Sequence, residues 1–233
     1  NIFINIKATL KKLGLNFNNY FNENSLYESG AIENVVKSLK SKKLVYIKDG
    51  ATWFKGSSVG CKQDRVIIKS TGEPTYRLPD IAYHLNKFSR DYELIVDVLG
   101  ADHMDAYPDV LSAIQQLDCD IDKMKVVIHQ FVTLTQDGEP VKMSTRKAQF
   151  ITLDELIQEV GKDVVRYFFI MRGNNSHLNF DMTIAKEESD ENPVYYLQYA
   201  HARLSNILKH AESQEIKINK KIDLSYLKLQ SEL

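Results

Sequence analysis

Two apolar runs near the middle of the chain constrain its fold more than any other feature. Residues 94–99 and 125–131 are almost continuously apolar, and residues 110–117 between them have a helical pattern. Strands that are apolar on both faces are typical of parallel sheets, which helices cover on both sides. The order strand, helix, strand therefore predicts a parallel βαβ unit and an α/β fold.

Polar residues follow both predicted strands. Asp102 and His103 come after Gly100 at the end of the first strand, and His129 and Gln130 lie at the end of the second. Ligands of parallel sheets bind beyond the carboxyl ends of the strands, where a carboxylate or an imidazole can also move protons. The alternative for Asp102 is a turn that its side chain stabilises.

The segments before this unit predict a helix, a hairpin and a further strand. Residues 33–42 have an amphipathic helical pattern, and residues 44–47 and 51–54 are strand-like around Asp49-Gly50, a pair that suits a type I′ turn. Residues 65–69 predict another strand. Pro79 predicts a helix that begins at that residue, because proline is favoured at the first helical position.

The pattern becomes helical after residue 150. Thr152 and Glu155 predict a capping box, residues 163–171 a second helix, and Asn192-Pro193 the start of a long third helix. We therefore place one α/β domain at 1–185 and the start of a helical domain at 186–233.

A basic loop is the most specific local signal for chemistry. Lys142, Ser144, Arg146 and Lys147 lie close together after Gly138 and Pro140. Mobile ammonium and guanidinium groups stabilise the charge of phosphates during their transfer. A solvated basic loop with no such role is an equally good interpretation of these residues alone.

Three residues nearer the amino terminus are ambiguous from the sequence alone. Asp80 lies four residues after Tyr76, and Glu23 lies between two asparagines. Asp80 could stabilise the first turn of its helix through the helix dipole. Alternatively, the phenol and the carboxylate could line a pocket for a cation.

Composition excludes several classes of protein. The 233 residues carry 30 Lys and Arg against 31 Asp and Glu, a net charge of -1 that excludes a strongly basic nucleic-acid arm, although the first 60 residues are basic. The apolar runs are too short to span a bilayer, and the two cysteines suggest reduced thiols in a cytosol. The six histidines have no metal-ligand spacing, so we expect no structural metal.

Taken in order, these segments resemble class I aminoacyl-tRNA synthetases, and among them the arginyl-tRNA synthetases. Residues 142–146 look like the lysine-methionine-serine signature loop of the class. The resemblance extends from about Leu13 to Leu208, through blocks at residues 25–30, 79–84, 100–103, 163–172, 176–181 and 191–203.

The resemblance implies the second half of a Rossmann-type catalytic domain with a parallel sheet, followed by the start of an all-α anticodon-binding bundle. It implies an arginine-tRNA ligase that activates arginine with ATP and transfers it to tRNA-Arg. Lys142, Ser144 and Arg146 would be catalytic residues of the signature loop. Glu23, Tyr76 and Asp80 would bind the arginine side chain.

The ATP and tRNA sites are also implied by the resemblance. Asp102, His103, His129 and Gln130, with Lys142, would bind ATP, which enters with Mg²⁺ as a substrate, and no tightly bound cofactor is expected. Tyr196, Tyr199 and Arg203 would contact tRNA, although core packing is a slightly better interpretation of each tyrosine. We expect a cytoplasmic monomer with no membrane partner.

The sequence departs from the family in three places. No His-x-Gly-His motif occurs, Thr145 replaces the second lysine of the commonest signature, and Met104-Asp105 replaces a His-Gly pair. Because the chain begins at Asn1 without Met, we interpret it as an interior segment that is inactive alone in adenylate formation. The alternatives are a truncated, non-catalytic paralogue that acts as a tRNA-binding module and another nucleotidyl-transfer enzyme of similar fold.

Overall fold

The computed structural model describes residues 2–141 and 151–216. The chain divides into two compact units. The first comprises Asn1–Leu134 and Phe168–Phe180, and the second comprises Thr135–Tyr167 and Asp181–Leu233. The signature loop, with Lys142, Ser144 and Arg146, lies outside the described residues, so its predicted role stays a prediction.

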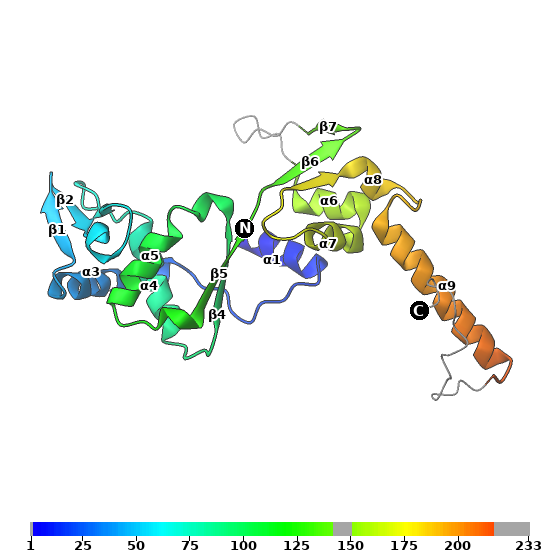
Figure 1. The fold of residues 1–233 in the computed structure, drawn as a ribbon, viewed down its shortest axis with the longest axis horizontal. Helices are drawn as coiled ribbons and strands as arrows, with labels where there is room; N and C mark the ends of the chain where they lie inside the picture. Colours follow the sequence, from blue (N-terminus) through cyan, green and yellow to red (C-terminus); the bar gives the residue numbers. More distant parts are fainter. Residues whose placement is uncertain (1, 142–150, 217–233) are drawn as a thin grey trace. The chain divides into compact units, whose positions relative to one another are not determined.

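The first unit contains helices and strands, and the predicted α/β elements are among them (Figure 1). In chain order these are α1 (Ile2–Lys12), α2 (Asn24–Glu28), α3 (Ala31–Ser41), β1 (Val45–Lys48), β2 (Ala51–Phe54), the short 3-10 helix η1 (Gly56–Val59), β3 (Arg65–Ile68), α4 (Arg77–Phe88), β4 (Ile95–Gly100), η2 (Ala101–His103), α5 (Tyr107–Gln116), η3 (Ile121–Lys123) and β5 (Met124–His129).

The remaining elements follow β5. They are β6 (Val132–Gln136), β7 (Glu139–Pro140), α6 (Leu153–Val160), α7 (Lys162–Ile170), β8 (Leu178–Asp181), α8 (Met182–Lys186) and α9 (Pro193–Ser213). The boundary between the two units passes through β6, α7 and the end of β8. None of the described helices is long and apolar enough to cross a membrane.

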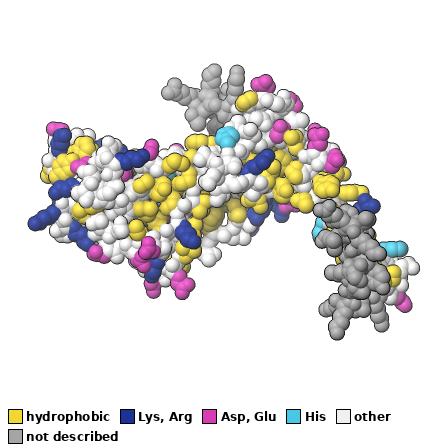
Figure 2. All heavy atoms as spheres, viewed as in Figure 1, with side chains coloured by type: hydrophobic (Ala, Val, Ile, Leu, Met, Phe, Trp, Pro, Cys, Tyr) yellow, Lys and Arg dark blue, Asp and Glu magenta, His cyan; other side chains and the backbone are white. Residues whose placement is uncertain are grey.

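The predicted βαβ unit is confirmed. Strands β4 and β5 are parallel and pair from Ile95 with Met124 to Gly100 with His129, with α5 between them in the chain. Burial of β4 is less complete than its apolar sequence predicts. Ile95 and Asp97 are buried, whereas Val96 and Val98 are exposed. Figure 2 shows, in yellow, that hydrophobic side chains also lie at the surface elsewhere on the face drawn.

The core of the first unit lies among the helices α2 to α5 and the antiparallel sheet β1-β2-β3. Residues of α3, α4 and α5 pack there with Phe54 of β2 and Ile67 of β3. The hairpin between β1 and β2 forms as predicted, since Asp49 and Gly50 both have positive φ, at 52° and 73°. This core holds α4, and therefore Asp80, in place.

Helix α4 begins earlier than the sequence predicts. Its first residue is Arg77, so Pro79 is the third residue of the helix. The first four N–H groups of a helix have no intrahelical partner, so a proline costs no hydrogen bond at any position in the first turn. The predicted start at Pro79 was therefore wrong by two residues, and Asp80 lies at the end of the first turn.

The second unit is helical, and its predicted helix starts are confirmed. Thr152 and Glu155 form a complete capping box at the start of α6. Asn192 caps α9, where its side chain accepts hydrogen bonds from the backbone N–H groups of Val194 and Tyr195. Lys186 of α8 forms an ion pair with Glu159 of α6.

Candidate functional site

Asp80 lies between two cavities of the first unit. One cavity, of about 450 Å³, is also lined by Glu23 and by the aromatic rings of Tyr20, Phe21 and Tyr83, and we call it the Glu23 cavity. The other, of about 540 Å³, is lined by residues of α4, α5 and β4, and we call it the β4 cavity. Asp80 and Tyr83 line both.

The carboxylate of Asp80 has no protein partner among the described residues. The residue is half-buried, yet only its backbone groups form hydrogen bonds. Burial raises the pKa of Asp80, while the positive charges of His84, His103 and Lys87 act in the opposite direction. A half-buried carboxylate that no protein group stabilises directly is suited to accept a cationic ligand.

Glu23 adds a second carboxylate to the Glu23 cavity. The residue precedes α2 and is exposed, and its side chain forms no capping hydrogen bond with that helix. The aromatic wall of the same cavity also attracts cations, because the ammonium group of Lys7 lies 4.3 Å from the ring centroid of Tyr20. Two acceptors and this wall make the cavity chemically suitable for a planar cation.

Tyr76 is not part of this cavity. It precedes the first residue of α4, and its side chain is 61% exposed, with the guanidinium group of Arg77 4.8 Å from its ring centroid. It lines a separate cavity of about 560 Å³ with Trp53 and Arg65. The structure thus brings together two of the three predicted arginine-binding residues, Glu23 and Asp80.

The residues predicted to bind ATP lie at the carboxyl ends of β4 and β5. Gly100 pairs with His129, so the two ends meet, and a side chain on Gly100 would collide with Asp102. Asp102 and His103 are exposed in η2, with 3.7 Å between Asp102 Oδ2 and His103 Nε2. His129 Nδ1 lies 2.6 Å from the backbone oxygen of Gln130. Of these four, only His103 lines the β4 cavity with Asp80.

Sequence analysis missed a buried polar network beside Asp80. Asp97 of β4 accepts hydrogen bonds from Lys87, whose Nζ lies 2.6 and 2.7 Å from its two carboxylate oxygens. His84 Nε2 lies 2.7 Å from the Oδ2 atom of Asp97. Two signals in the sequence point to its members, although not to their pairing: an acid inside an apolar strand, and a histidine and a lysine three residues apart on the preceding helix.

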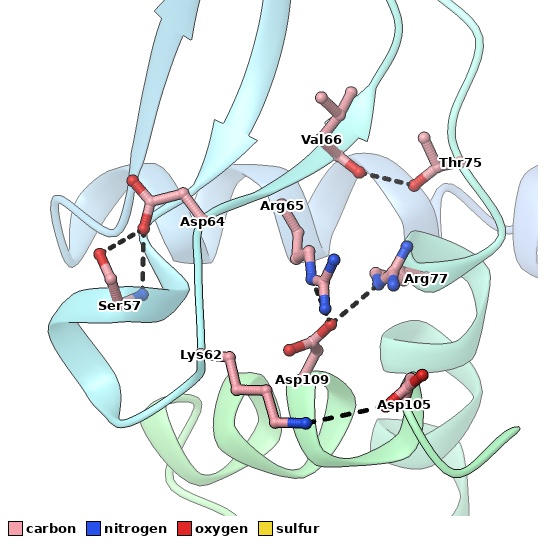
Figure 3. Close-up of polar contacts among 9 residues, drawn as sticks. All are labelled: Ser57, Lys62, Asp64, Arg65, Val66, Thr75, Arg77, Asp105 and Asp109. Carbon is pink, nitrogen blue, oxygen red and sulfur yellow. Dashed lines mark hydrogen bonds and ion pairs between the residues drawn. The ribbon is translucent and has the colours of Figure 1, made fainter.

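A second buried cluster was also missed, and it holds the antiparallel sheet to α5. In Figure 3 the guanidinium groups of Arg65 and Arg77 point toward the carboxylate of Asp109. The Nε atoms of the two arginines lie 2.8 and 3.1 Å from Asp109 Oδ2. Both arginines donate hydrogen bonds to one buried carboxylate. We therefore assign this cluster a role in the stability of the fold.

The predicted tRNA-binding residues lie on α9 in the second unit. Tyr196 and Tyr199 are 58% and 55% exposed, so neither packs into a core of the described residues. Tyr199 and Arg203 line one cavity of about 530 Å³, which Tyr196 does not line. Core packing, the slightly favoured interpretation of the tyrosines, has no support in this part of the chain.

Comparison with known proteins identifies the family. The family model described as tRNA synthetases class I (R), catalytic domain, matches residues 3–214. The chain belongs to the class I arginyl-tRNA synthetase family. This membership agrees with the α/β fold, with its parallel strand pair and long carboxyl-terminal helix.

Relatives of known name support the same family. The arginine–tRNA ligase of Desulfotalea psychrophila is 55% identical over 215 residues, which are 92% of this chain and 39% of the relative. The arginine–tRNA ligase of Salinibacter ruber is 50% identical over 232 residues, which are 100% of this chain and 41% of the relative. The chain therefore spans about two fifths of the length of these arginyl-tRNA synthetases.

Solved structures of arginyl-tRNA synthetases share the fold. The structure from Campylobacter jejuni aligns with a TM-score of 0.83 at 34% identity, over 97% of this chain and 49% of that one. The structure from Thermus thermophilus aligns with a TM-score of 0.74 at 18% identity, over 97% of this chain and 47% of that one. At 18% identity the second likeness bears on the fold alone.

Proposed function

We propose that the chain is part of an arginine–tRNA ligase and carries its arginine pocket. The whole reaction has two steps. The carboxylate of arginine attacks the α-phosphorus of ATP, and pyrophosphate leaves. The resulting arginyl-adenylate then reacts with a ribose hydroxyl at the 3′ end of tRNA-Arg, and AMP leaves.

The proposal rests mainly on the environment of the Asp80 carboxylate. It is half-buried without a protein partner, in a cavity that also contains Glu23. A guanidinium group is planar, is always charged, and donates pairs of hydrogen bonds that match a carboxylate. Arginine would satisfy Asp80, whereas uncharged citrulline would leave its charge unpaired.

The remaining proposed sites rest on the family resemblance. Asp102, His103, His129 and Gln130 are proposed to bind ATP with its Mg²⁺ at the carboxyl ends of β4 and β5. Lys142, Ser144 and Arg146 are proposed to stabilise the charge of the phosphates as pyrophosphate leaves. We also propose that residues 1–185 belong to the catalytic domain and that residues 186–233 begin the anticodon-binding bundle, where Tyr196, Tyr199 and Arg203 contact tRNA.

Tyr76 keeps a more limited role in this proposal. Its side chain lines another cavity, where the guanidinium group of Arg77 lies against its ring. Its position is compatible with a contact to a ligand that extends beyond the Glu23 cavity. Asp80 and Glu23 are therefore the proposed acceptors of the guanidinium group.

The proposal predicts that Asp80→Asn weakens arginine binding. The substitution removes the charge and one acceptor while it keeps the size of the side chain, and loss of a charge-assisted hydrogen bond costs about 1.5–3 kcal/mol, roughly 10- to 150-fold in affinity. Titration calorimetry of the 233-residue chain with arginine measures this. Asp49→Asn, in the exposed hairpin turn, is the matched control. Equal arginine affinity in Asp80→Asn and Asp49→Asn would contradict the assignment.

A further inference from the structure

Asp97 is a buried anion with two basic partners. Its side chain is 8% exposed, and its oxygens contact the Nζ atom of Lys87 and the Nε2 atom of His84. Burial opposes its ionisation, but the hydrogen bonds from His84 and Lys87 hold the pKa of Asp97 below its ordinary value. Asp97 is therefore an acceptor only.

His84 lies between two acceptors. Its Nε2 atom lies 2.7 Å from Asp97 Oδ2, and its Nδ1 atom lies 2.7 Å from the backbone oxygen of Asp80. A carbonyl oxygen and an ionised carboxylate have no proton to donate, so each ring nitrogen has to carry one. Two acceptors at these distances favour a positively charged imidazolium ring, one helical turn after Asp80.

Asp80 is surrounded by more positive than negative groups. His84 and Lys87 of its own helix and His103 of η2 favour its ionised form, and Asp97 of β4 opposes it. Glu23 adds a second negative charge to the Glu23 cavity. His84 is also hydrogen-bonded to the backbone oxygen of Asp80. It therefore affects Asp80 in two ways, through its charge and through this hydrogen bond.

We propose that His84 is a positioning residue for substrate recognition. Asp97 holds His84 as an imidazolium, and His84 in turn keeps Asp80 ionised and fixes the turn of α4 that carries Asp80. His84 does not touch the substrate. The inference rests on the proposed role of Asp80 as the acceptor of the guanidinium group. Lys87 contributes by neutralising Asp97, so that the network as a whole is cationic.

The protonation of His84 can be measured in the unmodified chain. Nitrogen NMR distinguishes an imidazolium ring, in which both nitrogens carry protons, from a neutral ring with one bare nitrogen. We expect both nitrogens of His84 to be protonated at neutral pH, with exposed His210 as the reference in the same spectrum. A bare nitrogen on His84 would overturn the proposal without the need for any variant.

The influence of His84 on Asp80 is tested by His84→Gln. Glutamine can still donate a hydrogen bond to Asp97 but carries no charge. The carbon NMR signal of the Asp80 carboxyl group should then titrate at a higher pH than in the unmodified chain. Lys87→Gln should shift it in the same direction, while exposed Lys123→Gln should not. An unchanged Asp80 titration in folded His84→Gln or Lys87→Gln overturns the proposal.

Arginine binding separates this inference from the proposed function. Each unit by which the pKa of Asp80 rises reduces its ionised fraction about tenfold at acidic pH. Arginine affinity of His84→Gln should therefore fall at acidic pH, by about tenfold for each unit by which the pKa of Asp80 rises, and recover as the pH rises. If arginine binds both proteins equally at every pH, the positioning role fails and the arginine pocket stands. If arginine binds neither and the Asp80 titration still shifts, the pocket fails while the electrostatic coupling stands.

Discussion

Three aspartates of the first unit differ in their partners, and the partners decide what each carboxylate can do. Asp109 accepts hydrogen bonds from two arginines, and Asp97 from a lysine and a histidine. Asp80 accepts none among the described residues. Paired carboxylates stabilise the fold, whereas a carboxylate without a partner costs stability until a ligand binds it.

The Asp109 cluster should therefore be sensitive to substitution. Asp109→Asn would leave the half-buried guanidinium groups of Arg65 and Arg77 without a counter-ion and should lower the free energy of unfolding by about 3 kcal/mol. Urea denaturation of the chain measures this. The control is Asp105→Asn, whose ion pair with Lys62 spans 3.8 Å between nearly fully exposed side chains, and we expect no measurable change. Similar small effects of both substitutions would contradict this assignment.

The low pKa of Asp97 predicts a dependence of stability on pH. A carboxyl group whose pKa is lower in the folded chain contributes stability above its unfolded pKa, near 3.8, and this contribution is lost as the pH falls through its folded pKa. The free energy of unfolding of the unmodified chain should therefore decrease in this acidic range. Asp97→Asn should be less stable at neutral pH and should show a smaller decrease. Parallel pH profiles of the two proteins would refute this.

Asp80 should show the opposite sign in the same measurement. Burial raises its pKa, so the folded chain binds a proton more readily than the unfolded chain, and ionisation of Asp80 lowers stability at neutral pH. Asp80→Asn should therefore be as stable as the unmodified chain or more stable, even though it binds arginine more weakly. A strong loss of stability on this substitution would mean that Asp80 has a structural role.

From the residues alone Asp80 was ambiguous, and the family resemblance gave it a role. The sequence did not specify which side chains pair with Asp97 and Asp109. Asp97 lies 13 residues from His84, and Asp109 lies 32 and 44 residues from its two arginines. Contacts between distant residues depend on how helices pack on strands, which hydrophobic periodicity does not specify. Tyr76 illustrates the same limit, because its spacing from Asp80 left a shared pocket open as one alternative, and the two residues line different cavities in the structure.

At the scale of elements, local patterns predicted most of the fold. Turn chemistry located the hairpin at Asp49-Gly50, side-chain caps located the starts of α6 and α9, and continuous apolar runs located β4 and β5. The start of α4 was missed, since proline is compatible with any position in the first turn. The alternating exposure of β4 was missed as well, because an apolar run gives no indication of what covers it.

The cap of α9 should stabilise the second unit more than an exposed cap does. Asn192 is 3% exposed, accepts hydrogen bonds at the start of α9, and donates two to the backbone oxygens of Ala185 and Glu187. Asn192→Ala should lower the free energy of unfolding of this unit by about 2–4 kcal/mol, because it removes a cap and leaves buried carbonyl groups unpaired.

Amide hydrogen exchange at Val194 and Tyr195, together with urea denaturation, measures this loss. Thr152→Ala, which removes the exposed cap of α6, is the control and should have the smaller effect. Equal effects of the two substitutions would show that the donated hydrogen bonds of Asn192 add nothing to its role as a cap.

For the molecule as a whole, the length of the chain limits the activity that we expect of it. It spans about two fifths of their length and contains no His-x-Gly-His sequence, which the family resemblance associates with ATP binding. We predict that the 233-residue chain alone does not catalyse arginine-dependent exchange of pyrophosphate into ATP. Exchange at the rate of a complete arginyl-tRNA synthetase, measured with labelled pyrophosphate, would contradict this prediction.

We propose above that Asp80 accepts the guanidinium group of arginine. A direct comparison of arginine with citrulline tests this contact. The measurement follows the carboxyl carbon of Asp80 by NMR while either ligand is added to the 233-residue chain. We expect a saturable shift of the Asp80 signal with arginine, weaker arginine binding in Asp80→Asn, and no shift with citrulline, which differs in lacking the charge. An Asp80 signal that stays unmoved by arginine, or that moves equally with citrulline, would contradict it.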